Sequence, residues 1–321
     1  MRYVVIGAGA IGGTVGGRLA EAGRDVVLVA RGAHLAALRE SGLRLDEPDR
    51  SRLLRLPAVG GVGEVDWRAG DVALLCTKTQ DTEPLLDALR AAAPDVPVVC
   101  AQNGVANERF AAARSAAVQA MCVVLPAAHL TPGRVVCYSA PVPGILDVGR
   151  YPEGADALSE QITADLTAAG FSSRSDPGVM RAKYRKLLVN LANAAEAACG
   201  PDSPGLPELV GAARAEGERC LAAAGIDVLP VEEERARRDG LITERPVDGA
   251  ARGGGSTWQS LRRAAGSVEA AYLNGEIVAL GRAHGVATPV NALLLATVTR
   301  MAEGAEQPGS RDARPLLAAA R

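Results

Sequence analysis

The feature that most constrains this chain is a glycine-rich turn directly after an N-terminal apolar run. The run Arg2–Ile6 is followed by Gly7-Ala8-Gly9-Ala10-Ile11-Gly12, where a helical period begins. In such a strand–turn–helix unit the first glycine permits a tight turn, the second admits a pyrophosphate, and the third lets helix and strand pack closely. A ligand-free tight turn is the alternative, but this placement favours a cofactor. The sequence therefore predicts a dinucleotide site at Gly7, Ala8, Gly9, Ala10, Ile11 and Gly12.

Strand and helix patterns alternate from this turn to about residue 175. Short β-branched runs, each followed by turn residues, lie at Arg2–Ile6, Asp25–Ala30, Asp71–Thr77 and Val96–Ala101. The intervening patterns predict helices over 11–22 and from 33 to Gly42, then a hairpin of 43–45 with 53–56. Further strands are expected at 118–125, 134–139, 145–148 and 171–174, with a helix at 155–168. We expect an α/β domain over 1–175, a doubly wound Rossmann sheet ending in a mixed or antiparallel portion.

From Val179 onward helical periods replace the strands. The boundary is expected at Ser175–Gly178, with an all-helical domain over 176–303 and a loose, flexible tail over 304–321. One helix should run from Val179 to Cys199. Ser256-Thr257-Trp258-Gln259 has the form of a capping box, and Thr288-Pro289 the form of a cap followed by a first-turn proline.

Composition excludes several classes of partner. Lys and Arg total 35 against 37 Asp and Glu without long blocks, which argues against nucleic acid or a membrane surface and for a small-molecule partner. No apolar run approaches the roughly 20 residues of a membrane span, and no export signal is visible, so a cytoplasmic location is expected. Three scattered histidines lack metal-ligand spacing, which predicts no metal site. The six cysteines are expected to be buried free thiols.

The second predicted strand ends at Arg31, where NAD sites usually place an acidic residue. An arginine there can form charge-assisted hydrogen bonds with a ribose 2′-phosphate, which a carboxylate would repel. A solvated loop cation is the alternative. The strand-end position favours NADPH as the cofactor, bound in part by Arg31.

Polar residues in both halves of the chain are candidates for the chemical site. Thr77-Lys78-Thr79 and Gln102-Asn103-Gly104 follow predicted strands, where open α/β sheets present side chains to ligands. On the helix 179–199, a polar face opposes a Leu/Ala stripe and consists of Lys183, Lys186, Asn190 and Asn193. Asparagine is a poor helix former, which suggests a function, although a solvated face is the alternative.

Together these residues resemble the ketopantoate reductase family. The resemblance covers residues 1 to about 303 and rests on the glycine turn, Arg31, Lys78, Gln102-Asn103-Gly104, Lys186-Leu187-Leu188-Val189-Asn190, Glu269 with Tyr272-Leu273-Asn274-Gly275, and His284–Asn291. It implies an NADPH-dependent reductase of 2-oxo acids, with Lys186 catalytic, Glu269 in the active site and Lys78 near the cofactor. It also implies substrate contacts from Asn103 and Asn190, and from a hydroxyl at Ser256 or Thr257. We further expect Asn103 to contact the cofactor and Asn193 to contact the substrate.

The chemistry fits these residue types. Ketone reduction needs a proton for the developing alkoxide, which an ammonium group such as Lys186 can supply. Glu269 could keep Lys186 protonated or bind a substrate hydroxyl, and the sequence leaves both roles open. Each candidate also has a structural alternative: a carboxylate is favoured in a helix's first turn, and capping alone would explain Ser256.

One departure from the family bears on the substrate. Many members carry an asparagine four residues beyond the position of Asn190, but this chain has Ala194 there and Asn193 one place earlier. The shift rotates the amide by about 100° around a helix. Besides reduction of ketopantoate, two hypotheses stay open: a related reductase of another 2-oxo acid, and a non-catalytic NADPH-binding regulator. A homodimer is also expected to be possible.

Overall fold

The structure is a computed structural model that describes residues 1–320 and divides into two compact units. The first unit contains Met1–Lys183 and Glu232–Arg252. The second contains Tyr184–Val231 and the chain from Gly253 onward. The first unit thus extends past the expected boundary at 175–178. It also includes Glu232–Arg252, which the sequence pattern assigned to the helical domain.

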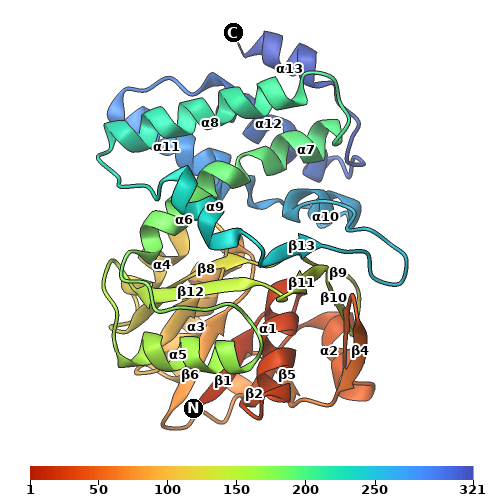
Figure 1. Ribbon diagram of the computed structural model, residues 1–321, viewed down its shortest axis with the longest axis vertical. Helices are drawn as coiled ribbons and strands as arrows, with labels where there is room; N and C mark the ends of the chain where they lie inside the picture. The colour runs from red at the N-terminus through yellow and green to blue at the C-terminus, as the bar shows by residue number, and fades with distance from the viewer. Residues whose placement is uncertain (321) are drawn as a thin grey trace. The chain divides into compact units, whose positions relative to one another are not determined.

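The first unit is built on a seven-stranded sheet that can be followed in Figure 1. Its strands, in spatial order, are β12 (Ile145–Arg150), β8 (Val118–Val124), β7 (Val98–Cys100), β6 (Asp71–Leu75), β1 (Arg2–Ile6), β2 (Asp25–Val29) and β5 (Ala58–Val59). Neighbours are parallel except β12, which runs antiparallel to β8. The predicted doubly wound sheet with an antiparallel end is confirmed. The chain leaves β1 toward β2 on one side and returns to β6 on the other, which makes this the switch point where such sheets bind ligands.

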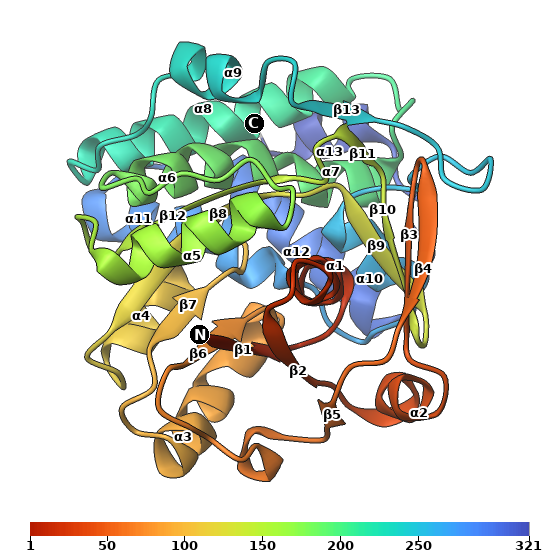
Figure 2. The same cartoon turned by 60° about the horizontal axis from the view of Figure 1, so that its bottom comes forward.

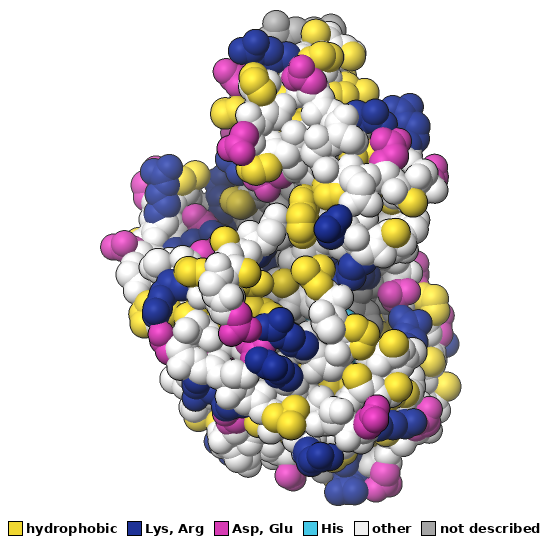
Figure 3. Space-filling model, turned by 90° about the vertical axis from the view of Figure 1, so that its right-hand side faces the viewer, with side chains coloured by type: hydrophobic (Ala, Val, Ile, Leu, Met, Phe, Trp, Pro, Cys, Tyr) yellow, Lys and Arg dark blue, Asp and Glu magenta, His cyan; other side chains and the backbone are white. Residues whose placement is uncertain are grey.

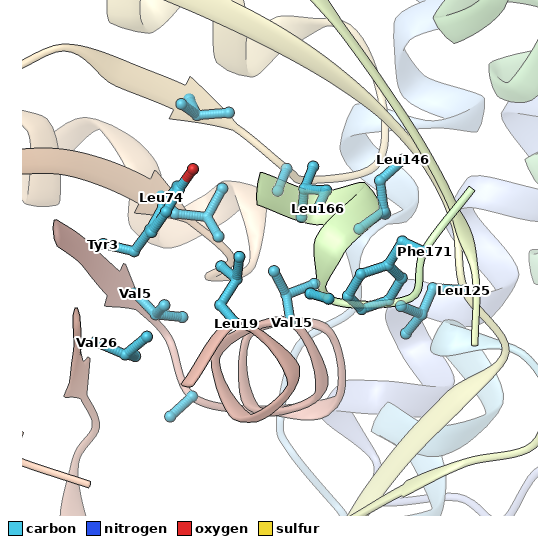
Figure 4. Packing of buried hydrophobic residues seen from close by; sticks show 14 of the residues in the cluster. Tyr3, Val5, Val15, Leu19, Val26, Leu74, Leu125, Leu146, Leu166 and Phe171 are labelled. Carbon is cyan, nitrogen blue, oxygen red and sulfur yellow. The ribbon is translucent and has the colours of Figure 1, made fainter. Parts of the chain in front are cut away.

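Helices cover both faces of this sheet because alternate strand residues face opposite ways. They are α1 (Ala10–Glu21), α2 (Gly32–Glu40), α3 (Thr82–Ala92), α4 (Ala106–Ala112) and α5 (Ala157–Ala168), with 3₁₀ turns η1 (Val62–Glu64) and η2 (Thr79–Asp81). Tyr3 and Val5 pack with α1 and α5, whereas Val4 and Ile6 pack with α3 and α4. Figure 4 shows Val15 and Leu19 of α1 pointing into the first of these two cores.

A separate four-stranded sheet lies beside α1. Its order is β4 (Arg50–Leu54), β3 (Leu43–Glu47), β10 (Arg134–Cys137) and β9 (Ala127–Thr131), as Figure 2 shows. The predicted hairpin is therefore present as β3 and β4. β3 of this hairpin pairs with β10, a strand that the sequence pattern predicts as part of the main sheet. Small residues on α1 allow the approach, since a Cβ on Gly13 would lie 2.8 Å from Val135 Cγ1.

The expected strand at 171–174 is met only in part, because the segment pairs in parallel with β12 but forms no regular strand. Only isolated bridges join this segment to β12, at Ser172 and Ser175, and Leu146 donates its backbone N–H to the Ser172 carbonyl at 2.9 Å. Phe171 explains the apolar pattern without a strand, because its ring is buried in the core beside α1 and α5.

Residues 232–252 dock onto the first unit through α9 (Val231–Arg238) and a short strand, β13 (Ile242–Glu244), that pairs with β11 (Ser139–Pro141). Arg237 donates two hydrogen bonds to Asp147, of 2.8 and 2.6 Å, and a third to Ser172 Oγ at 2.8 Å. These contacts join distant parts of the chain, which is why no local pattern predicted them.

The described part of the second unit contains helices and one 3₁₀ turn, as predicted for the second domain. Its elements are the last turns of α6 (Val179–Asn190), then α7 (Ala192–Cys199), α8 (Leu206–Ala223), α10 (Ser256–Arg262), η3 (Glu269–Tyr272), α11 (Asn274–His284), α12 (Pro289–Glu303) and α13 (Ala313–Ala319). The expected single helix 179–199 is interrupted at Leu191. Pro289 occupies the first turn of α12, as expected, and Glu216 accepts the backbone N–H groups of Val290 and Asn291 at 2.9 Å each.

Residues 304–320, expected to form a loose tail, make defined contacts within the second unit. Gly309 and Arg311 donate backbone N–H groups to the carbonyls of Ala197 and Ala198, each at 2.9 Å. Asp312 then caps α13, whose first residue, Ala313, is buried. Prolines and charges suggested a loose segment, but backbone hydrogen bonds to the end of α7 hold it in place.

The surface carries no sign of a large single-charge field on the face that Figure 3 shows, where basic and acidic side chains are interspersed. Within residues 1–320, no helix is long and apolar enough to cross a bilayer.

Candidate active site

The glycine turn after β1 has the geometry that a dinucleotide site requires. Gly7 has φ +101°, and a Cβ there would lie 2.8 Å from the Thr77 backbone nitrogen. A Cβ on Gly12 would lie 2.2 Å from the Gly7 carbonyl oxygen. A Cβ on Gly9, the N-cap of α1, would lie 3.7 Å from the nearest neighbouring atom. Space therefore remains beside the helix N-terminus. The turn therefore has the shape to admit a pyrophosphate.

A second feature beside the turn also fits a bound cofactor. Thr77 follows β6, and its Oγ1 is buried without a hydrogen-bond partner among the described residues. Buried hydroxyls are rarely left unpaired, so such an atom next to Gly7 is suited to a ligand. The residues present thus fit NADPH, with phosphates at the glycine turn.

His34 buttresses the turn from α2. Its Nδ1 accepts the Gly133 backbone N–H at 2.9 Å, and its Nε2 lies 2.7 Å from the Ala8 carbonyl oxygen. A carbonyl can only accept, so Nε2 carries the proton and the ring is neutral. Burial lowers the pKa of His34, although the hydrogen bond to Ala8 opposes this. The ring also lies against His129, with centroids 4.2 Å apart.

The lowered pKa of His34 predicts that the protein loses stability in mild acid. An unfolded histidine protonates near pH ~6.5. Stabilisation by the neutral ring is therefore complete above that value and is lost as pH falls through the lower folded pKa. We expect the melting temperature of the wild type to fall between about pH 7 and about pH 5, and to fall less in His34→Gln. Equal acid sensitivity in both proteins, measured by thermal unfolding, would contradict this role.

Arg31 lies where the sequence analysis placed it, immediately after β2 and at the N-cap of α2. Its side chain is 73% exposed, and Nη2 lies 3.5 Å from Asp81 Oδ2, whose side chain is 44% exposed. An ion pair this exposed is weak, so the guanidinium is available to a phosphate. The sequence analysis did not identify Asp81 as its neighbour.

Two loops at the carboxyl ends of β6 and β7 are tied together by buried polar side chains. Gln102 Nε2 donates to Thr82 Oγ1, and Thr82 donates to Asn107 Oδ1, both at 2.8 Å. Asn107 Nδ2 donates to the Asn103 carbonyl at 3.0 Å and to Thr79 Oγ1 at 3.2 Å. Lys78 and Asn103 therefore lie on loops that share one hydrogen-bond network. The sequence analysis missed Thr82 and Asn107.

In the second unit, the structure places Asn193 of α7 next to the start of α10. Asn193 Oδ1 would lie 3.1 Å from a Cβ on Gly255, the residue before Ser256. Asn190 Nδ2, Ser256 Oγ and Thr257 Oγ1 are buried, and each lacks a hydrogen-bond partner among the described residues. Unsatisfied donors and hydroxyls of this kind are suited to binding a polar ligand.

The predicted capping box at Ser256 is wrong. Gly255 is the N-cap of α10, no side chain caps the helix, and Ser256 is its first residue. The glycines before it pack against a ring, since a Cβ on Gly253 or Gly254 would lie 2.7 Å from Trp258. Capping therefore does not explain Ser256.

The remaining candidates also lie in the second unit. Lys186 lies on α6 and is half-buried, and Glu269 is buried in the first turn of η3. Ala194, the position of the family's further asparagine, is buried. Lys183 does not share an accessible polar face with Lys186, because it is buried in the first unit and paired with Glu108.

Burial disfavours ionisation of the cysteine thiols whose pKa it shifts. The six cysteines form no disulfide with one another, and five are buried as expected, whereas Cys76 is partly exposed. Burial raises the pKa of both Cys76 and Cys137 to about 12, which disfavours the thiolate. No group of three or more metal-ligating side chains occurs within residues 1–320.

Comparison with known proteins agrees with this arrangement. The family model described as ketopantoate reductase PanE/ApbA matches residues 3–153, and its C-terminal counterpart matches 178–302. A 2-dehydropantoate 2-reductase of Halobacterium salinarum is 32% identical over 94% of this chain and 99% of its own length. Its counterpart in Archaeoglobus fulgidus is 29% identical over 94% and 98%, respectively.

Solved structures show the same fold. A PanE/ApbA family ketopantoate reductase from Ralstonia eutropha has a TM-score of 0.79 at 28% identity, covering 95% of this chain and 99% of that one. A D-mandelate dehydrogenase, solved with NADH and anilino(oxo)acetate, has a TM-score of 0.80 at 22% identity with the same coverage. With both family models matched across most of its length, this chain belongs to the ketopantoate reductase family, as an NADPH-dependent oxidoreductase acting on CH–OH groups.

Proposed function

We propose that this protein reduces 2-dehydropantoate to pantoate with NADPH. The observation that carries the choice of a polar, hydroxylated oxo acid is the group of buried, unpaired side-chain atoms on Asn190, Ser256 and Thr257. Near-complete coverage of relatives named 2-dehydropantoate 2-reductase supports the same choice. The family assignment does not support the non-catalytic regulator.

In the proposed reaction, bound NADPH supplies a hydride to the ketone carbon. Lys186 donates a proton to the ketone oxygen, and its ammonium charge stabilises the alkoxide as that charge develops. The product is the 2-hydroxy acid, with NADP⁺ and a neutral lysine that regains its proton from water. Asn103, Asn190 and Asn193, with the hydroxyls of Ser256 and Thr257, would orient the acid.

Glu269 has two candidate roles, and substrate structure separates them. Trimethylpyruvate differs from 2-dehydropantoate only in lacking its hydroxyl group. A site that binds a substrate hydroxyl rejects the analogue lacking it, by as much as about 10⁴-fold in kcat/KM. If Glu269 binds that hydroxyl, Glu269→Gln reduces the discrimination between the two acids. If Glu269 orients Lys186, the variant lowers turnover of both acids equally.

A different 2-oxo acid is the second candidate substrate, favoured by the buried Ala194 in α7. The test is a panel of 2-oxo acids offered with NADPH, ranked by kcat/KM. The proposed substrate should rank first. Faster turnover of another acid would leave the proposed mechanism unchanged but would change the assigned substrate. The homodimer and the cytoplasmic location stay predictions. Light scattering, which measures molar mass in solution, would test the homodimer.

A further inference from the structure

We infer that Lys183 and Glu108 are positioning residues that hold the Gln102-Asn103-Gly104 loop for catalysis. The inference rests on the proposed function, because it assigns importance to a loop that carries Asn103. The proposed mechanism gives neither of these two side chains a role.

The pair is enclosed and directly bonded to the loop. Lys183 Nζ lies 2.6 Å from Glu108 Oε1, and the two side chains are 3% and 0% exposed. The same ammonium donates to the Gln102 carbonyl at 3.0 Å and to the Met121 carbonyl of β8 at 3.3 Å. Lys183 therefore makes two hydrogen bonds to backbone carbonyls, one of them in the loop, and Glu108 supplies the opposing charge.

The backbone of this loop is held in part by buried side chains. It follows β7 without a regular turn, and Gly104 has φ +79°. The Asn107 side chain holds the Asn103 carbonyl, while Lys183 holds the carbonyl of the residue before it. Buried side chains thus fix two consecutive peptide groups. This sets the direction in which the Asn103 side chain projects from the backbone.

Stability alone does not account for this pair. Removing two charges from water is costly, and apolar residues of similar volume often replace a buried ion pair without loss of stability. An apolar pair would, however, leave the Gln102 carbonyl buried without a donor. The role of the Lys183 ammonium group is therefore to fix the backbone of the loop after β7, where the substrate is proposed to bind.

The test compares two double variants. In Lys183→Met/Glu108→Leu the pair becomes apolar. In the control, Arg2→Met/Asp71→Leu, the replaced pair lies at the amino ends of β1 and β6, away from the loops, with the two side chains 13% and 2% exposed. Each protein is measured for melting temperature, NADPH affinity, kcat and KM, and for hydrogen–deuterium exchange of residues 101–106.

If the pair positions the loop, the first double variant loses about 10- to 100-fold in kcat, because small displacements at a reacting site are costly. Hydrogen–deuterium exchange at 101–106 becomes faster in this variant. The control, Arg2→Met/Asp71→Leu, retains the wild-type kcat and exchange rate at a similar melting temperature. Wild-type kcat and exchange in a folded Lys183→Met/Glu108→Leu protein would overturn the inference. If that protein does not fold, Lys183→Met/Glu108→Gln, which also leaves no buried charge and no donor from residue 183 to the Gln102 carbonyl, takes its place with the same expected and contrary results.

Failure of the proposed function gives a different pattern. A wild type that turns over no 2-oxo acid would refute the function, and exchange at 101–106 would still decide whether the pair holds the loop. Faster exchange in the variant, with no change in the control, would support the positioning role. Unchanged exchange would overturn it.

Discussion

Replacing Lys186 by alanine lowers kcat by about 10²- to 10⁴-fold, the usual contribution of a positioned general acid. The methyl group can neither donate a proton to the ketone oxygen nor stabilise its developing charge. NADPH affinity should change little, because the glycine turn and Arg31 belong to the other unit. Single-turnover kinetics at saturating NADPH would measure the chemical step directly.

Arg185 provides the matched control on the same helix. It is also a cation, and its Nε donates to the Leu229 carbonyl at 2.7 Å within the second unit. Arg185→Ala should cost some stability and leave kcat within a small factor of the wild type. A Lys186→Ala protein that binds NADPH and turns over at the wild-type rate would refute the assigned role of Lys186.

Replacing Arg31 by alanine raises KM for NADPH by about 10- to 100-fold, as expected for the loss of hydrogen bonds to a charged group. KM for NADH should hardly change, since NADH lacks the 2′-phosphate. The ratio of kcat/KM for the two cofactors, measured with one substrate, isolates this effect from any loss of stability.

Two neighbours sharpen that experiment. Asp81→Ala removes the carboxylate that lies 3.5 Å from Arg31 and should lower KM for NADPH slightly. Arg39 lies in the last turn of the same helix, where it donates to the Ala58 carbonyl at 3.0 Å, so Arg39→Ala should not alter cofactor preference. If Arg31→Ala raised KM equally for both cofactors, Arg31 would not be the group that recognises the phosphate.

The fold of the first unit was largely predictable because its signals are local. The strands β1, β2, β6 and β7 are short β-branched runs. The glycine spacing at Gly7–Gly12 is typical of a dinucleotide-binding turn. The same applies to the helix that begins at Pro289, where a proline in the first turn marks the boundary. In these segments propensity, burial and turn chemistry agree.

The missed features depend on contacts between distant residues. Phe171 is buried without a strand, and the segment after Gly309 is held by carbonyls of α7. Lys183 resembled a member of a helical polar face, but its partner carbonyl belongs to Gln102, 81 positions away. No periodicity in the sequence encodes such a pairing.

The candidate site was predicted in part, for a similar reason. The sequence located the strand-end loops that carry Arg31, Lys78 and Asn103, because parallel strands bring their carboxyl ends to one edge. It misassigned Ser256 as a cap, since Gly255 occupies that position instead. The roles of Lys186 and Glu269 came from the resemblance to a family and stay predictions.

The most direct test of the proposed function is the stoichiometry of the reaction. Purified protein is mixed with NADPH and 2-dehydropantoate, the loss of NADPH is followed by absorbance, and the product is identified by mass spectrometry. The expected result is one pantoate formed for each NADPH oxidised. Tight NADPH binding with no oxidation by 2-dehydropantoate or any other 2-oxo acid would contradict the proposed function.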